Sequence, residues 1–323
     1  SARCVDAVII ATPHFAHTTI GIAAFNAGLH VLVEKPISVH KADAERLIAA
    51  HKNKKQVFAA MFNQRTDPYY QRIRQLVQGG ELGAVRRVNW TITNWFRTHA
   101  YYGMGGWRAT WKGEGGGVLL NQCPHNLDLL QWIFGMPRRV TGHCTWGRYH
   151  DIEVEDDVTA YLEYANGSNC TFITSTGEAP GTNRLEIAGD MGRVVYEDDK
   201  LTWLKNEVAM GEFSRTTREA FGRPGTTEIP LPADGHGGQH LEILKNFTAA
   251  ILDGATLLSP GEEGIHSVEL ANSILLSAWL GQPVELPLSS ATYEAELNKK
   301  IATSKPKAKP TIEAISDLSK SVR

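Results

Sequence analysis

The chain has 323 residues, with 33 Lys or Arg against 35 Asp or Glu, a formal net charge of −2 and 42% apolar residues. This length is sufficient for two domains that each bury a core. A nearly neutral chain without a basic face argues against a nucleic-acid or anionic-membrane partner. The longest apolar runs, such as 5–12 and 31–33, fall far short of the roughly 18–20 residues that a membrane span needs, so we expect a soluble globular protein.

The four cysteines, at positions 4, 123, 144 and 170, are too few and too scattered for a disulfide framework. The first residues also lack the basic stretch and apolar core of a signal peptide. We therefore expect reduced thiols and a cytoplasmic protein.

Short apolar strands alternate with helices in the first part of the chain. We expect strands at 5–12, 30–33 and 56–62, with helices at 16–27 and 41–52. This alternation is typical of βαβ units and a parallel sheet. Ligands bind such sheets at the carboxyl ends of the strands. Those ends are Thr12-Pro13-His14, Glu34-Lys35-Pro36 and Asn63-Gln64-Arg65.

Beyond residue 68 the pattern changes. After a helix at 68–79, apolar and polar residues alternate strictly over 84–96, which predicts one long half-buried strand. One face of it would hold Val88, Trp90, Ile92, Asn94 and Phe96. Further strands are expected at 139–149, 158–164, 169–175, 184–188, 193–196 and 201–204, and helices at 124–134, 238–252 and 262–280. Runs of strands after a parallel unit predict an α+β domain with a large, mostly antiparallel open sheet.

Four motifs, in this order along the chain, resemble those of the Gfo/Idh/MocA family of NAD(P)-dependent oxidoreductases, which act mainly on sugars and polyols. They are Ala11-Thr-Pro-His14 with His17, Val33-Glu-Lys-Pro36, Asn63-Gln-Arg65 with Pro68, and Gly115-Gly-Gly117 leading into His125 and Asp128. An isolated Glu-Lys-Pro would be weak evidence, whereas all four at these spacings are specific. The resemblance covers nearly the whole chain, and implies NAD or NADP as cofactor and a sugar or polyol as substrate.

The resemblance also implies a segment that the sequence does not contain. Family members begin with a Rossmann unit carrying a G-x-G-x-x-G phosphate loop. The stretches 103–105 and 113–115 lack the third glycine and do not join a strand to a helix. We therefore expect the chain to begin at the fourth strand of the fold, with roughly 60 residues missing upstream. The domains would be 1–67, the C-terminal half of the Rossmann domain; 68–301, the substrate and oligomerisation domain; and 302–323, a flexible tail.

Lys35, His125 and Asn121 are the candidate catalytic residues, and Lys35 and His125 are expected to transfer the proton of the substrate hydroxyl. Lys35 ends a strand, and next to a cationic nicotinamide its pKa should fall, which suits proton transfer. The alternative is a lysine that closes the strand in an ion pair with Glu34. His125 begins a helix one turn after Asn121, so both can address one substrate; the alternative is a capping or buried structural histidine.

Asn121 departs from the family, which usually has Asp here. An amide cannot take a proton or stabilise an imidazolium by its charge, although it can bind a sugar hydroxyl as donor and acceptor. The departure keeps open an enzyme that cleaves glycosides with transient oxidation by bound NAD. A non-catalytic sugar-sensing protein on the same fold is the other alternative, against which the retention of Lys35 and His125 argues.

The remaining site residues are assigned from the resemblance and from composition. The segment 101–111 has the aromatic and glycine content of a sugar-binding loop, although about half of this signal is ordinary packing. His236 and His240 lie four apart, but no third ligand is placed to complete a metal site, so we expect no metal and place His236 in the substrate pocket. For Arg65 a salt bridge is an equal alternative, and Asp128 is interpreted as structural. Cofactor contacts are expected from Thr12, Pro13, His14, His17, Glu34, Lys35, Asn63 and Arg65, and substrate contacts from Trp107, Arg108, Asn121, His125 and His236.

The open face of the large sheet is expected to be buried in a homo-oligomer, a dimer or tetramer. Trp146 and Tyr149 are candidate contacts.

Because the phosphate loop is absent from the sequence, we predict that the 323-residue chain binds a dinucleotide weakly. Isothermal titration calorimetry with NAD and NADP measures this directly. Tight binding of either would contradict the expected start at the fourth strand.

Overall fold

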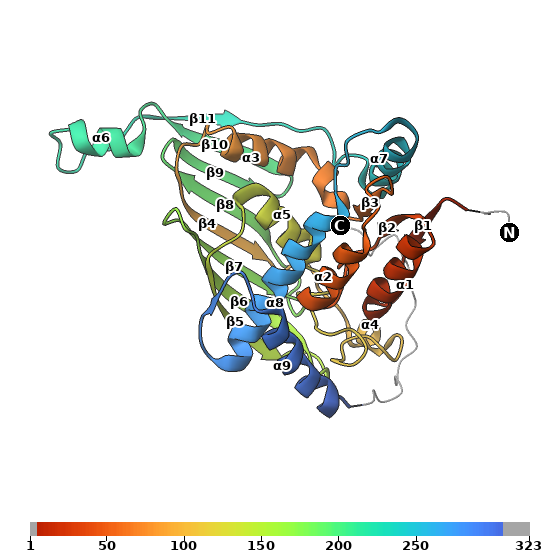
Figure 1. Cartoon of the computed structure of the whole chain (residues 1–323). Coiled ribbons are helices and arrows are strands. Elements are labelled where there is room, and N and C mark those ends of the chain that lie inside the picture. The colour runs from red at the N-terminus through yellow and green to blue at the C-terminus, as the bar shows by residue number, and fades with distance from the viewer. Residues whose placement is uncertain (1–4, 306–323) are drawn as a thin grey trace.

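The computed structural model describes residues 5–305. The chain forms a small sheet, A, and a large sheet, B, with helices packed between them (Figure 1). Of the tail expected at 302–323, residues 302 and 303 end a helix, and 306–323 lie outside the described residues.

Sheet A is parallel, with the strand order β1-β2-β3. Alternate residues of β2 point to opposite faces. Val31 and Val33 pack with the helices α1 and α2, while Leu32 packs with Phe247 of α7. Helices therefore cover both faces, as in a doubly wound sheet. The bounds are β1 Ala7–Ile10, α1 His14–Asn26, β2 His30–Val33, α2 Lys41–Ala50, β3 Phe58–Ala60 and α7 Gln239–Asp253.

Sheet B has nine strands in the order β11-β10-β9-β8-β4-β7-β6-β5-β12, and all pairs are antiparallel except β4 with β7. Its inner face packs on α3, α5 and α8 around buried residues such as Trp90 and Phe172. The strands are β4 Val85–Ile92, β5 Arg139–Trp146, β6 Glu155–Glu163, β7 Asn169–Ser175, β8 Asn183–Gly189, β9 Gly192–Glu197, β10 Lys200–Asn206, β11 Thr226–Pro230 and β12 Val284–Glu285. The helices are α3 Pro68–Gln78, α5 Pro124–Phe134 and α8 Gly264–Leu280. The expected fold class, a partial Rossmann sheet followed by a mostly antiparallel open sheet, is confirmed.

The strand expected over 84–96 is shorter than predicted. It ends at Ile92, where its pairing with β7 and β8 stops, and Asn94 and Phe96 are exposed. Apolar and polar residues go on alternating after Ile92 in the sequence. This pattern depends on side-chain polarity and does not show where the neighbouring strands end. The sequence reading also missed β11, β12 and several short or polar helices: α4 His99–Gly103, α6 Met210–Thr216, α9 Ser290–Thr303, η1 Asn63–Thr66 and η2 Gly261–Glu263.

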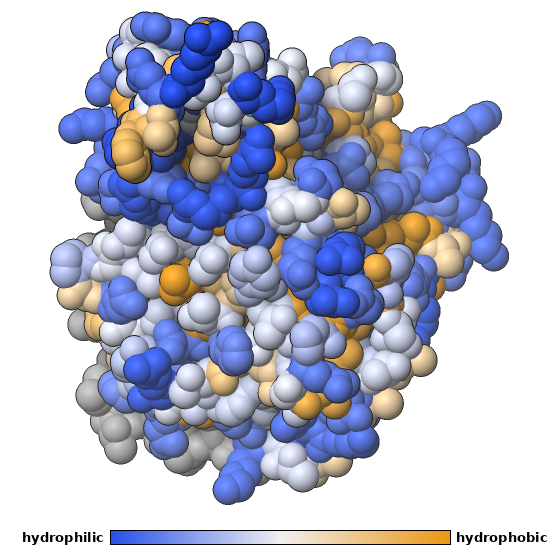
Figure 2. Space-filling model, turned by 90° about the vertical axis from the view of Figure 1, so that its left-hand side faces the viewer, coloured by the Kyte–Doolittle hydropathy of each residue, from blue (hydrophilic) through white to orange (hydrophobic). Residues whose placement is uncertain are grey.

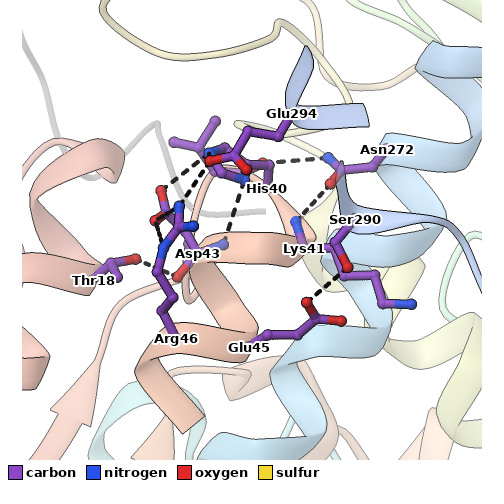
Figure 3. Close-up of polar contacts among 11 residues, drawn as sticks. Thr18, His40, Lys41, Asp43, Glu45, Arg46, Asn272, Ser290 and Glu294 are labelled. Atoms are coloured by element: carbon purple, nitrogen blue, oxygen red, sulfur yellow. Dashed lines mark hydrogen bonds and ion pairs between the residues drawn. The ribbon is translucent and has the colours of Figure 1, made fainter. Parts of the chain in front are cut away.

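Polar contacts tie α2, beside the parallel sheet, to α8 and α9 of the second part (Figure 3). The Lys41 backbone N–H donates to Asn272 Oδ1 at 2.9 Å, and Lys41 Nζ lies 2.7 Å from Glu269 Oε1 in a buried ion pair. On the rim, Arg46 bonds Glu294. The buried pair of Lys41 and Glu269 is costly to break, because removing one partner leaves the other as an unpaired buried charge. These contacts fix the sheet-A edge relative to the second domain.

The face of sheet B away from the helices is open (Figures 1 and 2). Side chains of intermediate hydropathy predominate across the middle of this face, with scattered apolar ones among them. Tyr161 is exposed on this face and Tyr149 in the loop after β5, whereas Trp146, expected as an oligomer contact, packs against Trp279 of α8 and so lies on the helix side of the sheet. The segment with α6 projects from one end of the sheet as an arm (Figure 1). Across residues 5–305, no helix has the length and apolar content to cross a membrane.

Candidate active site

The candidate site lies where the carboxyl edge of sheet A meets a loop of the second domain. Lys35 directly follows β2, and its Nζ donates to the backbone oxygen of Asn121 at 2.6 Å. His125 lies in the first turn of α5, one turn further along. The positive charge of Lys35 acts on His125 and lowers its pKa. The structure therefore brings Lys35, Asn121 and His125 together, although they are distant in the sequence.

Lys35 is held in a partly buried environment that disfavours its charge. Burial lowers the pKa of Lys35, the carboxylates of Glu34 and Glu114 act in the opposite direction, and Arg97 lowers it further. The Glu34 carboxylate accepts from the Lys35 backbone N–H at 3.2 Å, whereas the side-chain ammonium donates to Asn121. This geometry disfavours the alternative in which Lys35 only closes the strand.

His125 is buried and kept neutral. Burial, then Lys35, then His240 lower the pKa of His125 well below its usual value. Its Nδ1 is buried and has no hydrogen-bond partner within residues 5–305. Over the same residues α5 has no side-chain cap. The capping alternative therefore does not apply, and the ring has a nitrogen available to a ligand.

The side chain of Asn121 lies in a polar network. Its Nδ2 donates to the Glu114 carboxylate, and its Oδ1 accepts from Tyr101 Oη at 3.2 Å and from Gln122 Nε2 at 3.1 Å. Asn121 thus contributes its backbone oxygen to Lys35 and its amide to this network.

The glycine segment before Asn121 is held by a buried carboxylate on β6. Glu155 accepts from the backbone N–H groups of Gly117 at 2.8 Å and Leu119 at 3.0 Å. A Cβ at Gly117 would overlap the Glu155 backbone carbonyl, so the close approach requires glycine. Burial raises the pKa of Glu155 to about 7.

The aromatic loop closes the site on the side of the second domain. Arg108 Nη1 donates to Tyr101 Oη at 2.9 Å, and its guanidinium lies 4.7 Å from the Trp107 ring centroid. The Trp107 ring in turn lies 5.7 Å from that of His14, at the edge of sheet A. Trp107 and Arg108 therefore line the same site as His14.

Buried polar atoms without partners lie at the sheet edge where a cofactor was expected. Within the described chain these include Nδ1 of His14 and Oδ1 of Asn63. Burial, with Lys35 next, lowers the pKa of His14 to about 3. Thr12 and Pro13 are exposed beside them and Glu34 partly so. Unpartnered buried polar atoms are costly, so these residues fit a polar ligand such as the nicotinamide end of a dinucleotide.

Two residues assigned to the cofactor have structural roles. Both ring nitrogens of His17 contact backbone oxygens, those of Pro36 and Thr12, each at 2.8 Å, and the ring is fully buried. His17 thus joins the ends of β1 and β2 and has no nitrogen left for a cofactor.

Arg65 forms the salt bridge that was its alternative. Its Nε and Nη2 bind both Asp128 oxygens at 2.7 Å, and Nη1 binds Glu263 at 2.5 Å and the Leu258 carbonyl at 3.3 Å. Four of its five donors are used, so the structure removes Arg65 from the cofactor set and agrees with a structural Asp128.

His236 was expected to reach the substrate pocket, but His240 is the histidine that acts on His125. His236 is half exposed and its Nδ1 pairs with Asp67 Oδ2 at 2.8 Å, which raises its pKa. His240, in the first turn of α7, is the histidine whose charge acts on His125. The two histidines thus have different partners, and residues 5–305 contain no group of three His, Cys, Asp or Glu placed to hold a metal.

The sequence reading missed Glu114, which is 2% exposed and binds Asn121. A charged residue between Gly113 and Gly115, at the start of a glycine segment, was the available signal. Gln122 and Tyr101 were missed as partners of Asn121 for the same reason, since hydrogen bonding between loops leaves no periodic pattern.

Two family models match the chain. Residues 1–62 match an oxidoreductase family with an NAD-binding Rossmann fold, and residues 70–195 match the Gfo/Idh/MocA C-terminal domain. Levoglucosan dehydrogenase of Pseudarthrobacter phenanthrenivorans is 24% identical over 89% of this chain and 81% of its own length. Inositol 2-dehydrogenase of Rhizobium meliloti is 26% identical over 86% of this chain and 79% of its own. A solved structure of the WlbA dehydrogenase from Chromobacterium violaceum, in complex with NADH and UDP-GlcNAcA, matches with a TM-score of 0.75 and 28% identity over 89% of this chain and 79% of that one.

The parallel sheet and the open-sheet domain, with the matched family models and relatives, define an NAD-binding oxidoreductase of the sugar and polyol dehydrogenase type. The chain belongs to the Gfo/Idh/MocA family, so the family resemblance is confirmed. The expected start at the fourth strand stays a prediction.

Glu155 gives a pH-dependent stability. Its carboxyl ionises near pH 4.5 when unfolded and at about 7 in the folded chain. Between these values unfolding releases a proton, so the free energy of unfolding falls as the pH rises, by up to about 3 kcal/mol. The difference in unfolding free energy, Glu155→Gln minus wild type, should therefore rise by about 3 kcal/mol from pH 4.5 to 7 in urea titrations.

Glu163→Gln, on the same strand but partly exposed, is the matched control and should show a much smaller change. A Glu155→Gln difference that stays constant over this range would show that the buried carboxyl ionises as it does in the unfolded chain.

Proposed function

We propose that this protein is an NAD(P)-dependent dehydrogenase that interconverts a secondary hydroxyl and a ketone on a sugar, polyol or glycoside. Lys35 and His125 transfer the hydroxyl proton. The observation that carries the proposal is the contact of Lys35 Nζ with the Asn121 backbone oxygen, which sets the ammonium beside the loop that leads to His125.

The nicotinamide supplies the hydride acceptor or donor when bound. Thr12, Pro13, His14, Glu34 and Asn63 would hold it, since they lie at the carboxyl ends of the parallel strands.

The chain's own groups suit a proton transfer. Burial keeps His125 neutral, so its imidazole can take a proton from a hydroxyl and return it, and the lowered pKa of Lys35 makes its proton easier to give up. Trp107 can stack on the C–H face of a sugar ring while Arg108 donates to a ring hydroxyl. The two sides of the site thus bind and deprotonate the same substrate.

The relatives support a carbohydrate substrate, because the matched structure holds UDP-GlcNAcA and the curated relatives are named for levoglucosan and inositol. Glycoside cleavage was kept open because Asn121 replaces an Asp. The Glu114 carboxylate adjoins Asn121, so the site does not lack a negative charge. The argument for glycoside cleavage from the missing Asp is therefore weaker.

Lys35→Met and His125→Gln should each lower kcat by about 100-fold or more, because each removes a proton-transfer group. The assay follows reduced nicotinamide by absorbance with a panel of sugars and polyols, at NAD or NADP concentrations raised until the rate saturates, because weak dinucleotide binding is predicted. Binding of the same sugar, measured by calorimetry, should be retained.

Lys200→Met and His143→Gln are the matched controls, since both side chains are exposed on strands of sheet B. They should keep wild-type kcat. Wild-type turnover in Lys35→Met or His125→Gln would refute the proton-transfer roles, and a wild-type protein that binds sugars without turnover would favour the sensor alternative.

We further propose a homo-oligomer that buries the open face of sheet B. Tyr161 of β6 is exposed there without a covering layer in the described chain, and this wide sheet face can pack against a second copy of the chain. Tyr149 lies in the loop after β5, and Trp146 contacts Trp279 of α8 on the helix side of the sheet, so Trp146 is not a contact of the open face. Light scattering after size exclusion should give a dimer or tetramer. Tyr161→Glu should shift it toward the monomer, whereas Leu252→Glu, exposed on α7, should not; a monomeric wild type would refute the proposal.

A further inference from the structure

Glu114 is a buried carboxylate at the centre of the candidate site. It is 2% exposed and lies in the loop that precedes the glycine segment. One oxygen accepts from Asn121 Nδ2, and the other accepts from the Ala109 backbone N–H at 2.6 Å. Both carboxylate oxygens are therefore engaged by the two loops that carry the site.

We propose that Glu114 is a positioning residue for this site: its carboxylate orients the Asn121 amide and supplies the negative charge that Asn121 lacks. The inference rests on the proposed dehydrogenase function. It adds a residue that acts through Asn121 and Lys35, without contact to the substrate.

The hydrogen bonds around Asn121 have a fixed direction because an ionised carboxylate can only accept. Asn121 Nδ2 must point to Glu114, so its Oδ1 points to Tyr101 and accepts from the Tyr101 hydroxyl. The Tyr101 oxygen in turn accepts from Arg108 at 2.9 Å. The orientation that Glu114 imposes on Asn121 thus reaches the arginine proposed to bind the sugar.

Gln122 locks the same orientation. Its Nε2 donates to Asn121 Oδ1 and to Tyr101 Oη, each at 3.1 Å. A flipped Asn121 amide would set its Nδ2 against the Gln122 donor and leave Glu114 facing an oxygen. Only the observed orientation satisfies all of these groups.

The charge of Glu114 acts on Lys35, where it opposes the effect of burial on the lysine pKa. Asn121 contributes a backbone oxygen and no charge. Glu114 and Glu34 therefore stabilise the protonated lysine, with Arg97 opposing them. The titratable or charged groups that act on Lys35, or on which Lys35 acts, are Glu34, Glu114, Cys123, Arg97, His14 and His125; Glu114 also acts on Tyr102 and Glu155.

A carboxylate–amide exchange tests the pairing. Glu114→Gln alone sets two amide donors against each other, and Asn121→Asp alone sets two carboxylates against each other. In the double variant E114Q/N121D the new amide at 114 donates to the new carboxylate at 121. The remaining carboxylate oxygen accepts from Tyr101 and Gln122, and the amide oxygen at 114 accepts from Ala109, so every bond is kept and the charge stays in the pair.

Each single variant should lose about tenfold or more in kcat/KM, and the double variant should return to within about threefold of wild type. The second readout needs no turnover: the ¹³C shift of dimethylated Lys35, assigned by its loss in Lys35→Arg, followed against pH. In Glu114→Gln the lysine should lose its proton at lower pH than in wild type, and in the double variant its titration should move back.

Thermal unfolding is recorded for all four proteins. Single variants that unfold while the double variant folds and is active would also support the pairing. A double variant that unfolds, or one no better than the worse single variant, would overturn it, as would an unchanged Lys35 titration in Glu114→Gln. A wild type that is inactive at saturating NAD and NADP, or an active Lys35→Met, would refute the dehydrogenase function, and the Lys35 titration would still decide the role of Glu114.

Discussion

The close approach of the glycine segment 115–117 to the neighbouring elements is the constraint on which the candidate site depends. A side chain at Gly117 would collide with the backbone of Glu155, and one at Gly115, whose φ is +83°, would collide with Val39 beside the parallel sheet. Without this approach the Asn121 backbone oxygen could not reach Lys35. The segment has little secondary structure of its own, so buried carboxylates on either side of it, Glu114 and Glu155, hold its backbone and its neighbours.

Elements with strong local signals could be predicted from the sequence. The strand His30–Val33 and the helix Pro124–Phe134 have the predicted bounds, since the first is an apolar run and the second begins with Pro and ends before Gly. The end of β4 could not be predicted, because it depends on where β7 and β8 stop. Helix α9 was missed because its polar residues carry little amphipathic pattern, and only its contacts with α2 and α8 show how it packs.

The predictable part of the site was the pair of groups at element ends. Lys35 follows a parallel strand and His125 starts a helix, and the strand topology alone brings such ends to one edge. The family motif could not show whether a polar side chain was already satisfied. His17 and Arg65 look like ligand residues by position, yet each uses its donors within the protein. Glu114 is the reverse case, a site residue that the sequence did not predict. No family motif includes it, and only the folded loops show what its carboxylate binds.

The electrostatics of the site follow from burying several basic groups together. Burial lowers the pKa of Lys35, His14 and His125, and the Lys35 charge lowers those of both histidines further. Three adjacent cations would repel one another in a partly buried pocket, so the two histidines stay neutral. For Lys35, burial disfavours the charged form and the nearby carboxylates favour it. A neutral imidazole can take a proton from an alcohol, and so can a lysine after its lowered pKa has let it release its own proton, whereas a fully charged cluster could not. The carboxylates of Glu34 and Glu114 limit the fall of the Lys35 pKa, because they stabilise the protonated lysine. The proton transfer that we propose is therefore a property of the whole buried cluster and not of Lys35 or His125 taken singly.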